Sequence, residues 1–253
     1  MPRPRIYKTE AIVLRKTNLA EADGILTLYT PNLGKIRATA RGIRKPRSRL
    51  AGHLDPLSRS VMLIARGRSL DIITQSEMLE SFPSLRQDLR HIACAIYIAE
   101  LVDKFTIEEA ENYGIYILLT DSLRRLGETR DPDMLLRCFE LRLLGLAGYQ
   151  PQVFQCPGCG SSLNPVRNLF SPAAGGVLCP VCGARESAAR PISVDALKVM
   201  RFLLSNNQDS IERLRVPREL ATEIKYLIRA YIRYTLEHDL KSVEFLEDLE
   251  RTR

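Results

Sequence analysis

The first 80 residues alternate apolar and polar positions in short runs, and residues that favour turns separate these runs. Runs of this length, rich in aliphatic and β-branched residues, predict strands. Thr30 to Gly34 predicts a hairpin turn between two of them, with Gly34 in the left-handed conformation. Because no helical period separates the strands, we expect a five-stranded OB-type β-barrel. The predicted strands are residues 11–14, 25–29, 36–40, 61–65 and 70–74.

The hydrophobic period becomes helical after Ser84. Cys94 and Cys138 each fall on an apolar stripe and are therefore expected in the core. Thr106 to Glu109 has the form of a capping box, which predicts a helix over residues 107–126. Further helices are predicted from Asp131 to about Gly148, from Ser193 to about Leu204, from Asp209, from Pro217 to Glu237, and over Val243–Leu249.

Four of the six cysteines occur in two copies of the pattern Cys-Pro-x-Cys-Gly. Cys156 and Cys159 form the first pair, and Cys179 and Cys182 form the second pair after 19 intervening residues. This spacing is typical of a zinc (Zn²⁺) site with four thiolate ligands. Four sulfurs complete a tetrahedron and leave no position for water or substrate, so we expect a structural metal.

The glycines after each pair, Gly160 and Gly183, are expected to take positive φ, which lets backbone N–H groups point at sulfur. A redox dithiol pair is the alternative interpretation of the cysteines. A disulfide framework is disfavoured, because the chain has no secretion signal.

Together these patterns predict a multi-domain α+β protein. We expect an OB-fold nucleic-acid-binding domain at residues 1–80 and an all-α domain at residues 81–253. A zinc ribbon with four cysteine ligands interrupts the helical domain at about residues 152–188. Met1 leads into cations with no apolar segment behind it, and no apolar run reaches the length of a membrane span. We therefore expect a cytoplasmic protein with reduced thiols and no membrane partner.

The positive charge of the chain is concentrated in its first third. The formal net charge is +7, and residues 1–80 alone hold 15 Lys+Arg against 7 Asp+Glu. No acid occurs between Asp23 and Asp55, and the third strand alternates small apolar residues with cations that should point outward. The candidate DNA-binding residues are Lys35, Arg37, Arg41, Arg44, Lys45, Arg47 and Arg49.

A cationic strand face that leads into a flexible basic loop suits a phosphate backbone, because the barrel fixes some charges and the loop adapts the others. The alternative is a merely solvated loop, and a membrane surface is disfavoured because no amphipathic helix or lipidation motif accompanies the charge. Only Tyr7 and Tyr29 are available for stacking in this region. Charge should therefore dominate binding, with little sequence specificity, steep salt dependence and some duplex binding.

The sequence contains no recognisable catalytic constellation. His53, His91 and His238 are isolated from one another, and the chain lacks a phosphate-binding loop, a nucleophile elbow and a zinc-protease motif. Phosphodiester cleavage usually needs acids that hold Mg²⁺ near the backbone, and the basic region is the part poorest in acids. We therefore expect no enzymatic activity.

The chain resembles the bacterial RecO family of recombination mediators over nearly its whole length. Phe139-Glu-Leu-Arg-Leu-Leu-Gly-Leu-Ala-Gly-Tyr149-Gln-Pro151, followed by the first cysteine pair, is similar to the family's most recognisable segment. Ala40-Arg41-Gly42 with its basic continuation is similar to the family's OB-fold domain. Leu240-Lys241-Ser242 with Phe245-Leu246 resembles the C-terminal signature, although Val243 stands where a basic residue is expected.

The resemblance implies an OB domain packed on a helical domain that carries the ribbon, and a role without catalysis. It implies binding of single- and double-stranded DNA, annealing, and loading of recombinase onto DNA coated by single-strand-binding protein, with a RecR-type partner. It also implies that the acidic, apolar-ended tail of single-strand-binding protein docks on the helical domain. The eligible cations for that tail are Arg124, Arg125, Arg229 and Arg233.

We therefore predict a nucleoid-associated DNA repair mediator in a bacterial cytoplasm. Two alternatives come from other classes of protein. One is a zinc-ribbon RNA-binding factor that acts on the ribosome or a transcript, and the other is a metal-dependent nuclease.

Overall fold

The computed structural model describes residues 5–19, 21–206 and 208–251. The chain divides into two compact units, which we call unit 1 (Met1–Glu128 with Ser242–Arg253) and unit 2 (Thr129–Lys241). This division groups the first helices with the strands, whereas the sequence predicts a boundary at residue 80. None of the described helices combines the length and the apolar character needed to cross a lipid bilayer.

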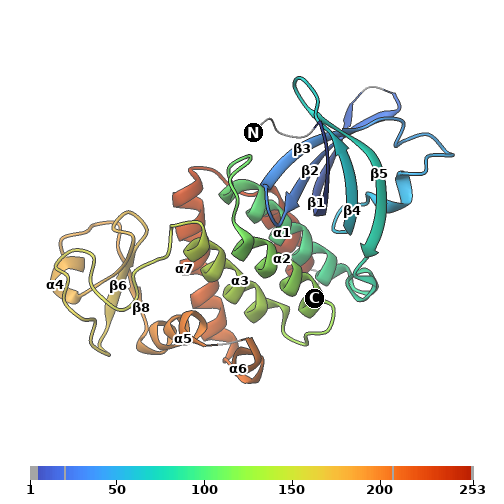
Figure 1. Cartoon of the computed structure of the whole chain (residues 1–253). Helices are drawn as coiled ribbons and strands as arrows, with labels where there is room; N and C mark the ends of the chain where they lie inside the picture. The colour runs from blue at the N-terminus through green and yellow to red at the C-terminus, as the bar shows by residue number, and fades with distance from the viewer. Residues whose placement is uncertain (1–4, 20, 207, 252–253) are drawn as a thin grey trace. The chain divides into compact units, whose positions relative to one another are not determined.

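Five strands of unit 1 form a closed barrel in the order β1-β2-β3-β5-β4 (Figure 1). Neighbouring strands pair in antiparallel fashion, except that β3 and β5 form a short parallel ladder. The prediction of a five-stranded OB-type barrel is therefore confirmed. The strands are β1 (Ile6–Leu19), β2 (Asp23–Thr30), β3 (Gly34–Ala40), β4 (Arg59–Ala65) and β5 (Asp71–Glu80).

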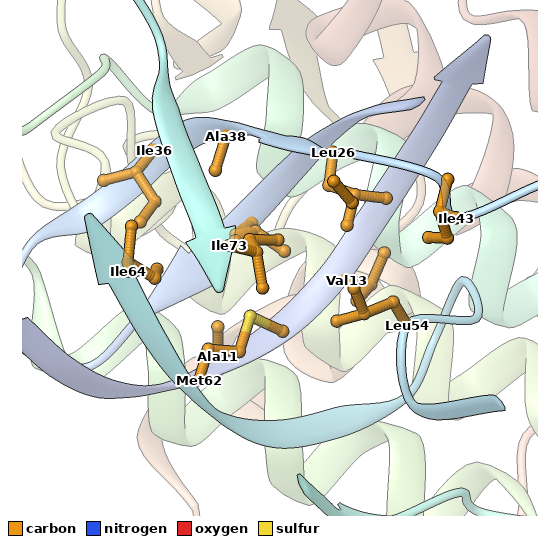
Figure 2. Close-up of a cluster of buried hydrophobic side chains, with 12 residues drawn as sticks. Ala11, Val13, Leu26, Ile36, Ala38, Ile43, Leu54, Met62, Ile64 and Ile73 are labelled. Carbon is orange, nitrogen blue, oxygen red and sulfur yellow. The ribbon is translucent and has the colours of Figure 1, made fainter. Parts of the chain in front are cut away.

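The interior of the barrel is filled by aliphatic side chains from all five strands (Figure 2). On β3 the inward positions are Ile36, Ala38 and Ala40, which are at most 5% exposed, as the alternation predicts. Ile43 follows β3 and enters the same cluster near Leu54 with 1% exposure. The chain after β3 is therefore attached to the barrel core by an apolar side chain.

Helices α1 (Leu89–Phe105) and α2 (Tyr113–Leu126) complete most of unit 1. Asp88 is the N-cap of α1, and its side chain accepts a hydrogen bond from the backbone of Arg90. The final helix, α8 (Lys241–Arg251), belongs to unit 1 from Ser242 onward. Two short 3₁₀ helices, Ala51–His53 and Pro83–Gln87, lie in the connections of this unit.

The prediction that Thr106 to Glu109 form a capping box was wrong. Residues 107–112 are not helical, and Glu109 N donates to the carbonyl of Lys35 on β3 at 2.8 Å. Glu109 takes a φ of 57°, which a helix does not allow. Pairing with the exposed edge of β3 therefore overrides the local helix signal, and α2 begins only at Tyr113, after the N-cap Asn112.

Unit 2 consists of helices and a small three-stranded sheet with strand order β7-β6-β8. Asp131 and Ser193 act as N-caps of their helices, as predicted. Cys138 is 1% exposed, and Cys94 of unit 1 is fully buried, so both predicted core cysteines are confirmed. The elements of unit 2 are α3 (Pro132–Leu146), β6 (Asn168–Ser171), β7 (Gly176–Leu178), α4 (Pro180–Gly183), β8 (Arg190–Ile192), α5 (Val194–Ser205), α6 (Gln208–Arg213) and α7 (Arg218–Leu236).

The turn before β3 leads to a testable prediction about stability. Gly34 has a φ of 62°, and a Cβ atom at this position would lie 1.9 Å from the carbonyl oxygen of Ala110. Gly34→Ala should therefore lower the free energy of unfolding by more than about 1 kcal/mol, through backbone strain and the clash. Urea unfolding measures this loss. Gly52→Ala is the control, because a Cβ there meets no atom within 4 Å, and equal stability of both variants would contradict the prediction.

Candidate metal centre and nucleic-acid interface

The two cysteine pairs meet in unit 2. The Sγ atoms of Cys156, Cys159, Cys179 and Cys182 all lie within 4.8 Å of one another. The Sγ atoms of Cys159 and Cys179 are 3.8 Å apart. A tetrahedron with zinc–sulfur bonds of about 2.3 Å has edges of about 3.8 Å, so this separation fits one metal ion shared by the four sulfurs. It is far longer than a disulfide bond.

Hydrogen bonds to sulfur prepare these thiols for a metal. Cys179 N donates to Cys156 Sγ at 3.3 Å, and Cys182 N lies 3.5 Å from Cys179 Sγ. The hydroxyl of Ser161, 3.0 Å from Cys159 Sγ, is the main reason that the pKa of Cys159 falls to about 6. Burial opposes ionisation of Cys156, but amide N–H groups outweigh it and lower the pKa of that thiol. Contact with Cys159 and Cys179 instead raises the pKa of Cys182 to about 12, and a cation at the centre would offset this and favour the thiolate of Cys182.

The glycines of the two cysteine turns have different roles. Gly160 takes a φ of 72°, as predicted, and its N–H donates to Cys156 O at 2.7 Å. The prediction for Gly183 was wrong, because Gly183 lies in the short helix α4 and its φ is not positive. A Cβ at Gly183 would lie 2.6 Å from a methyl carbon of Leu169, so close packing against β6 requires glycine there. Gly158 similarly makes room for Cys182, whose Sγ would lie 3.1 Å from an added Cβ.

Other parts of unit 2 hold the ribbon in place. Arg201 on α5 donates to the carbonyls of Val153 and Leu163 at 2.7 and 3.1 Å, on either side of the first cysteine pair. Phe170 on β6 packs edge-on against Tyr231 of α7, with ring centroids 5.9 Å apart. The cysteines therefore close a folded module rather than line an open site, and the four-thiolate set fits a structural zinc ion.

The basic loop, which we define as residues 41–49, lies on the surface of unit 1. Its five cations are all exposed, and no carboxylate among the described residues pairs with Arg41, Lys45, Arg47 or Arg49. Among the described residues of the barrel, this basic loop carries the highest local density of exposed cations. The five residues are Arg41, Arg44, Lys45, Arg47 and Arg49.

The basic loop is a series of hydrogen-bonded turns, whereas its sequence predicts a flexible segment. Gly42 takes a φ of 65°, and its N–H donates to Asp23 Oδ1 at 2.7 Å. Arg44 N donates to Ala22 O at 3.0 Å, and Lys45 N donates to Gly42 O at 3.1 Å. With Ile43 buried in the barrel, these contacts fix the backbone while the long cationic side chains remain in solvent.

The two cations within β3 have different surroundings from those of the loop. The expectation that Lys35 points into solvent was wrong, because its side chain is only 12% exposed and its Nζ lies 3.3 Å from Asp103 Oδ1. The same Nζ donates to the carbonyl oxygen of Asp103. Arg37 is 43% exposed and its Nε lies 3.9 Å from Glu108 Oε1. Acids of α1 and of the segment after it therefore neutralise the start of β3, and sequence patterns gave no signal of this contact.

The tyrosines of the barrel are poorly placed for stacking on bases. Tyr29 is fully buried, and its hydroxyl donates to Asn112 O at 3.2 Å. Tyr7 is partly buried, donates to Asp71 Oδ2 at 2.6 Å, and has the guanidinium of Arg66 over its ring at 4.9 Å. The barrel therefore offers charge rather than free aromatic rings, which agrees with the expectation of binding dominated by phosphate contacts.

Other charges of the barrel are used within unit 1. Arg59 contacts both Glu10 and Glu80, and Arg124 of α2 binds Glu80 with two hydrogen bonds of 2.8 Å. The hydrogen bonds from Arg124, together with Arg59, lower the pKa of Glu80 below its usual value. This network links the barrel to α2, and no local pattern in the sequence predicts it. His53 is also structural, because its Nδ1 accepts a hydrogen bond from Met78 N at 3.3 Å.

Comparison with known proteins identifies the family. The family model described as Recombination protein O N terminal matches residues 3–82, and the model described as Recombination protein O C terminal matches residues 86–244. The chain belongs to the RecO family. RecO proteins are DNA repair and recombination proteins, and the chain is similar to many curated relatives that carry the name DNA repair protein RecO.

Three RecO relatives show how complete the similarity is. The protein of Roseiflexus sp. (strain RS-1) is 43% identical over 247 residues, which cover 98% of this chain and 87% of the relative. The protein of Symbiobacterium thermophilum is 42% identical over 251 residues, which cover 98% of this chain and 99% of the relative. The protein of Dehalococcoides mccartyi (strain ATCC BAA-2266) is 39% identical over 251 residues, which cover 99% of each chain.

The segments that resemble RecO proteins have structural roles in this chain. Residues 139–151 form the second half of α3 and the turn that enters the ribbon, where Gly148 takes a φ of 85°. Arg142 in this segment donates to Asn206 O at 2.6 Å. In the C-terminal signature, Ser242 N donates to Glu100 Oε2 of α1 at 2.8 Å, and the Ser242 hydroxyl donates to the same oxygen. These contacts stabilise helix ends within each unit.

The metal centre leads to a second testable prediction. Cys179→Ser, or Cys156→Ser, should remove zinc from the purified chain and lower its melting temperature by at least about 5 °C, because metal binding at such sites contributes directly to folding. Metal analysis and thermal unfolding measure the two effects. Cys138→Ala is the control, because this core substitution changes stability but should leave the zinc content unchanged. A metal-free Cys179→Ser variant that melts like the unmodified chain would show that the metal is not structural.

Proposed function

We propose that this RecO-family protein is a non-catalytic mediator of recombination in DNA repair, which binds single- and double-stranded DNA through its N-terminal barrel. The observation that carries the proposal is the basic loop at residues 41–49, with five exposed cations on a backbone that hydrogen bonds and Ile43 hold in place. A fixed backbone with mobile cationic side chains can contact phosphates without selecting a base sequence.

The proposed interface contains only some of the candidate residues that the sequence predicts. Arg41, Arg44, Lys45, Arg47 and Arg49 form its centre, and Arg37 lies at its margin because Glu108 competes for its charge. Lys35 has no place in it, because a phosphate would have to displace Asp103 from a largely buried side chain. The interface is therefore the loop that follows β3 rather than the face of the strand.

Charge neutralisation gives a mechanism for strand annealing. Two single strands repel each other through their phosphates, and this repulsion opposes the encounter that must precede base pairing. A cationic surface that contacts phosphates of both strands lowers the repulsion and raises their local concentration. No covalent step is required, so the proposal needs no catalytic residue.

The arrangement of possible metal ligands supports a role without catalysis. Among the described residues, the four cysteines are the one group of three or more His, Cys, Asp or Glu side chains that could hold a metal ion. Four thiolates leave no open coordination position. We propose that the zinc ion only maintains the fold of unit 2 and supplies no chemistry to DNA.

The partners that we propose follow from the family. They are a RecR-type protein and the acidic tail of single-strand-binding protein, and with them the chain would help recombinase load onto coated single strands. Of the cations that could bind that tail, Arg124 already donates hydrogen bonds to Glu80, and Arg233 lies 3.7 Å from Asp239. These internal pairs make both arginines weaker candidates than the sequence suggests.

Reversal of the loop charges tests the proposal. A variant with Arg41, Arg44, Lys45 and Arg47 replaced by Glu should fold normally and lose binding to single- and double-stranded DNA. Each lost phosphate contact should reduce the slope of log affinity against log salt by about 0.7–0.9. Fluorescence anisotropy of labelled DNA at several salt concentrations measures both quantities in the full chain. An unchanged slope would mean that the loop is not the DNA surface.

The same experiment includes a matched control and distinguishes the proposed function from two alternatives. The control reverses four exposed arginines of unit 2, namely Arg130, Arg185, Arg213 and Arg218, and should retain most of the duplex affinity. Competition by RNA that exceeds competition by DNA would favour an RNA-binding factor instead. Shortening of labelled DNA in the presence of Mg²⁺ or Mn²⁺, abolished by substitution of acids, would favour a nuclease.

A further inference from the structure

Helix α7 presents aromatic rings and cations along the same stretch. From Ile224 to Leu236 it contains no acid, and it carries three tyrosines and three Lys or Arg residues. Tyr226 and Tyr234 are 51% and 56% exposed. They are eight residues apart, so they are separated by about 12 Å along the helix axis. Exposed rings interleaved with cations are characteristic of surfaces that bind single-stranded nucleic acid.

The C-terminal end of α7 also lines a cavity of about 700 Å³. This volume is within the range of sites that accept small organic groups. Tyr149 and Tyr234 line the cavity with rings that are about half exposed, and the lining also contains the largely buried Tyr231, which packs edge-on against Phe170. The polar side chains in the lining are Arg233, Thr235, Glu237, His238 and Asp239.

The charges of the cavity indicate what can enter it. Arg233 Nε lies 3.7 Å from Asp239 Oδ1, so these two charges largely offset each other, and Glu237 adds a second carboxylate. A phosphate or a peptide carboxylate would meet this negative charge and be repelled. A nucleobase is neutral, can stack on the tyrosine rings, and can donate its N–H groups to the carboxylates. The cavity therefore suits a base and not its phosphate.

The surface beside the cavity suits the backbone of the same strand. Arg190 is exposed, and its guanidinium stands over the ring of Tyr226 at 5.5 Å. Lys225 and Arg229 lie on α7 between the cavity and the helix start, and both are partly buried, with the Nε of Arg229 fully so. The separation of about 12 Å between Tyr234 and Tyr226 is the length of three to four stacked nucleotides, and because Arg190 covers one face of the Tyr226 ring, this end of the surface offers a cation rather than a free ring. These cations also disfavour a basic peptide as the occupant.

We propose that α7 and this cavity form a second binding surface, specific for single-stranded DNA, in which one unpaired base stacks on Tyr149 and Tyr234. Duplex DNA is excluded because its bases are already stacked and paired. This surface lies in unit 2, whereas the basic loop lies in unit 1, so each can be removed without changing the other. A protein with both surfaces holds an unpaired strand at one and any DNA at the other.

Removal of the two rings tests this inference. The full chain with Tyr149→Ala and Tyr234→Ala should bind a single-stranded oligonucleotide that contains 2-aminopurine at least about fivefold more weakly for each ring removed. Fluorescence of the 2-aminopurine reports stacking directly, and duplex affinity should not change. The Tyr149→Phe and Tyr234→Phe variants should retain single-strand binding, because the rings remain. Tyr113→Ala is the matched control, since this α2 tyrosine is also 56% exposed.

The possible outcomes separate this inference from the proposed function. Unchanged single-strand affinity in the alanine variants, with binding still lost on reversal of the basic loop, would overturn the second surface alone. Equal losses for single and double strands would also overturn it, because stacking of unpaired bases cannot explain them. Retained single-strand affinity with weaker binding of a synthetic poly-aspartate peptide that ends in phenylalanine would assign the cavity to an acidic protein tail instead.

Discussion

The register of β3 is the constraint on which the surface of the barrel depends. Its inward positions carry Ile36, Ala38 and Ala40, and its outward positions carry Lys35, Arg37 and Thr39. A slip by one residue would exchange the two faces and bury Lys35 and Arg37 in the barrel, at a cost of several kcal/mol for each unpaired charge. Gly34 at one end of the strand and Ile43 beyond the other hold this register.

The position of acids then decides which of these cations remain in solvent. Asp103 and Glu108 approach the start of β3, so the first cations of the acid-free span are already paired when the protein is folded. The basic loop lies beyond the end of the strand, and its turns are built from backbone hydrogen bonds rather than ion pairs. The positive charge is therefore concentrated on a segment whose backbone is held by hydrogen bonds and whose cationic side chains are exposed.

The stability of the ribbon in unit 2 depends on a different physical constraint, namely its small size. A segment of this size buries too little apolar surface to fold by itself, and metal coordination commonly replaces the missing core. The four cysteines lie close together, Phe170 attaches β6 to α7, and Arg201 of α5 binds the carbonyls of Val153 and Leu163 on either side of the first cysteine pair. The ring of Tyr231 thus contacts the ribbon and also lines the cavity at the end of α7, so a metal ion held by the four cysteines would stabilise both.

Much of the fold was determined by local patterns in the sequence. The alternation in residues 36–40 fixed the faces of β3, the turn at Gly34 fixed the hairpin, and Asp131 and Ser193 marked helix starts, because each depends on neighbours within a few residues. The pairing of Cys156 and Cys159 with Cys179 and Cys182 was also predictable, since thiolate spacing reflects the geometry of a metal.

Only the tertiary structure decided which charged side chains and aromatic rings lie on the surface. The sequence of Thr106 to Glu109 predicts the start of a helix. In the structure the backbone N–H of Glu109 instead donates to the carbonyl of Lys35 at the start of β3. Lys35 and Tyr29 look accessible in the sequence, yet contacts with α1 and with Asn112 remove both from the surface. These two contacts join residues 68 and 83 positions apart. No local period records them, because they arise only when the barrel and the helices pack together.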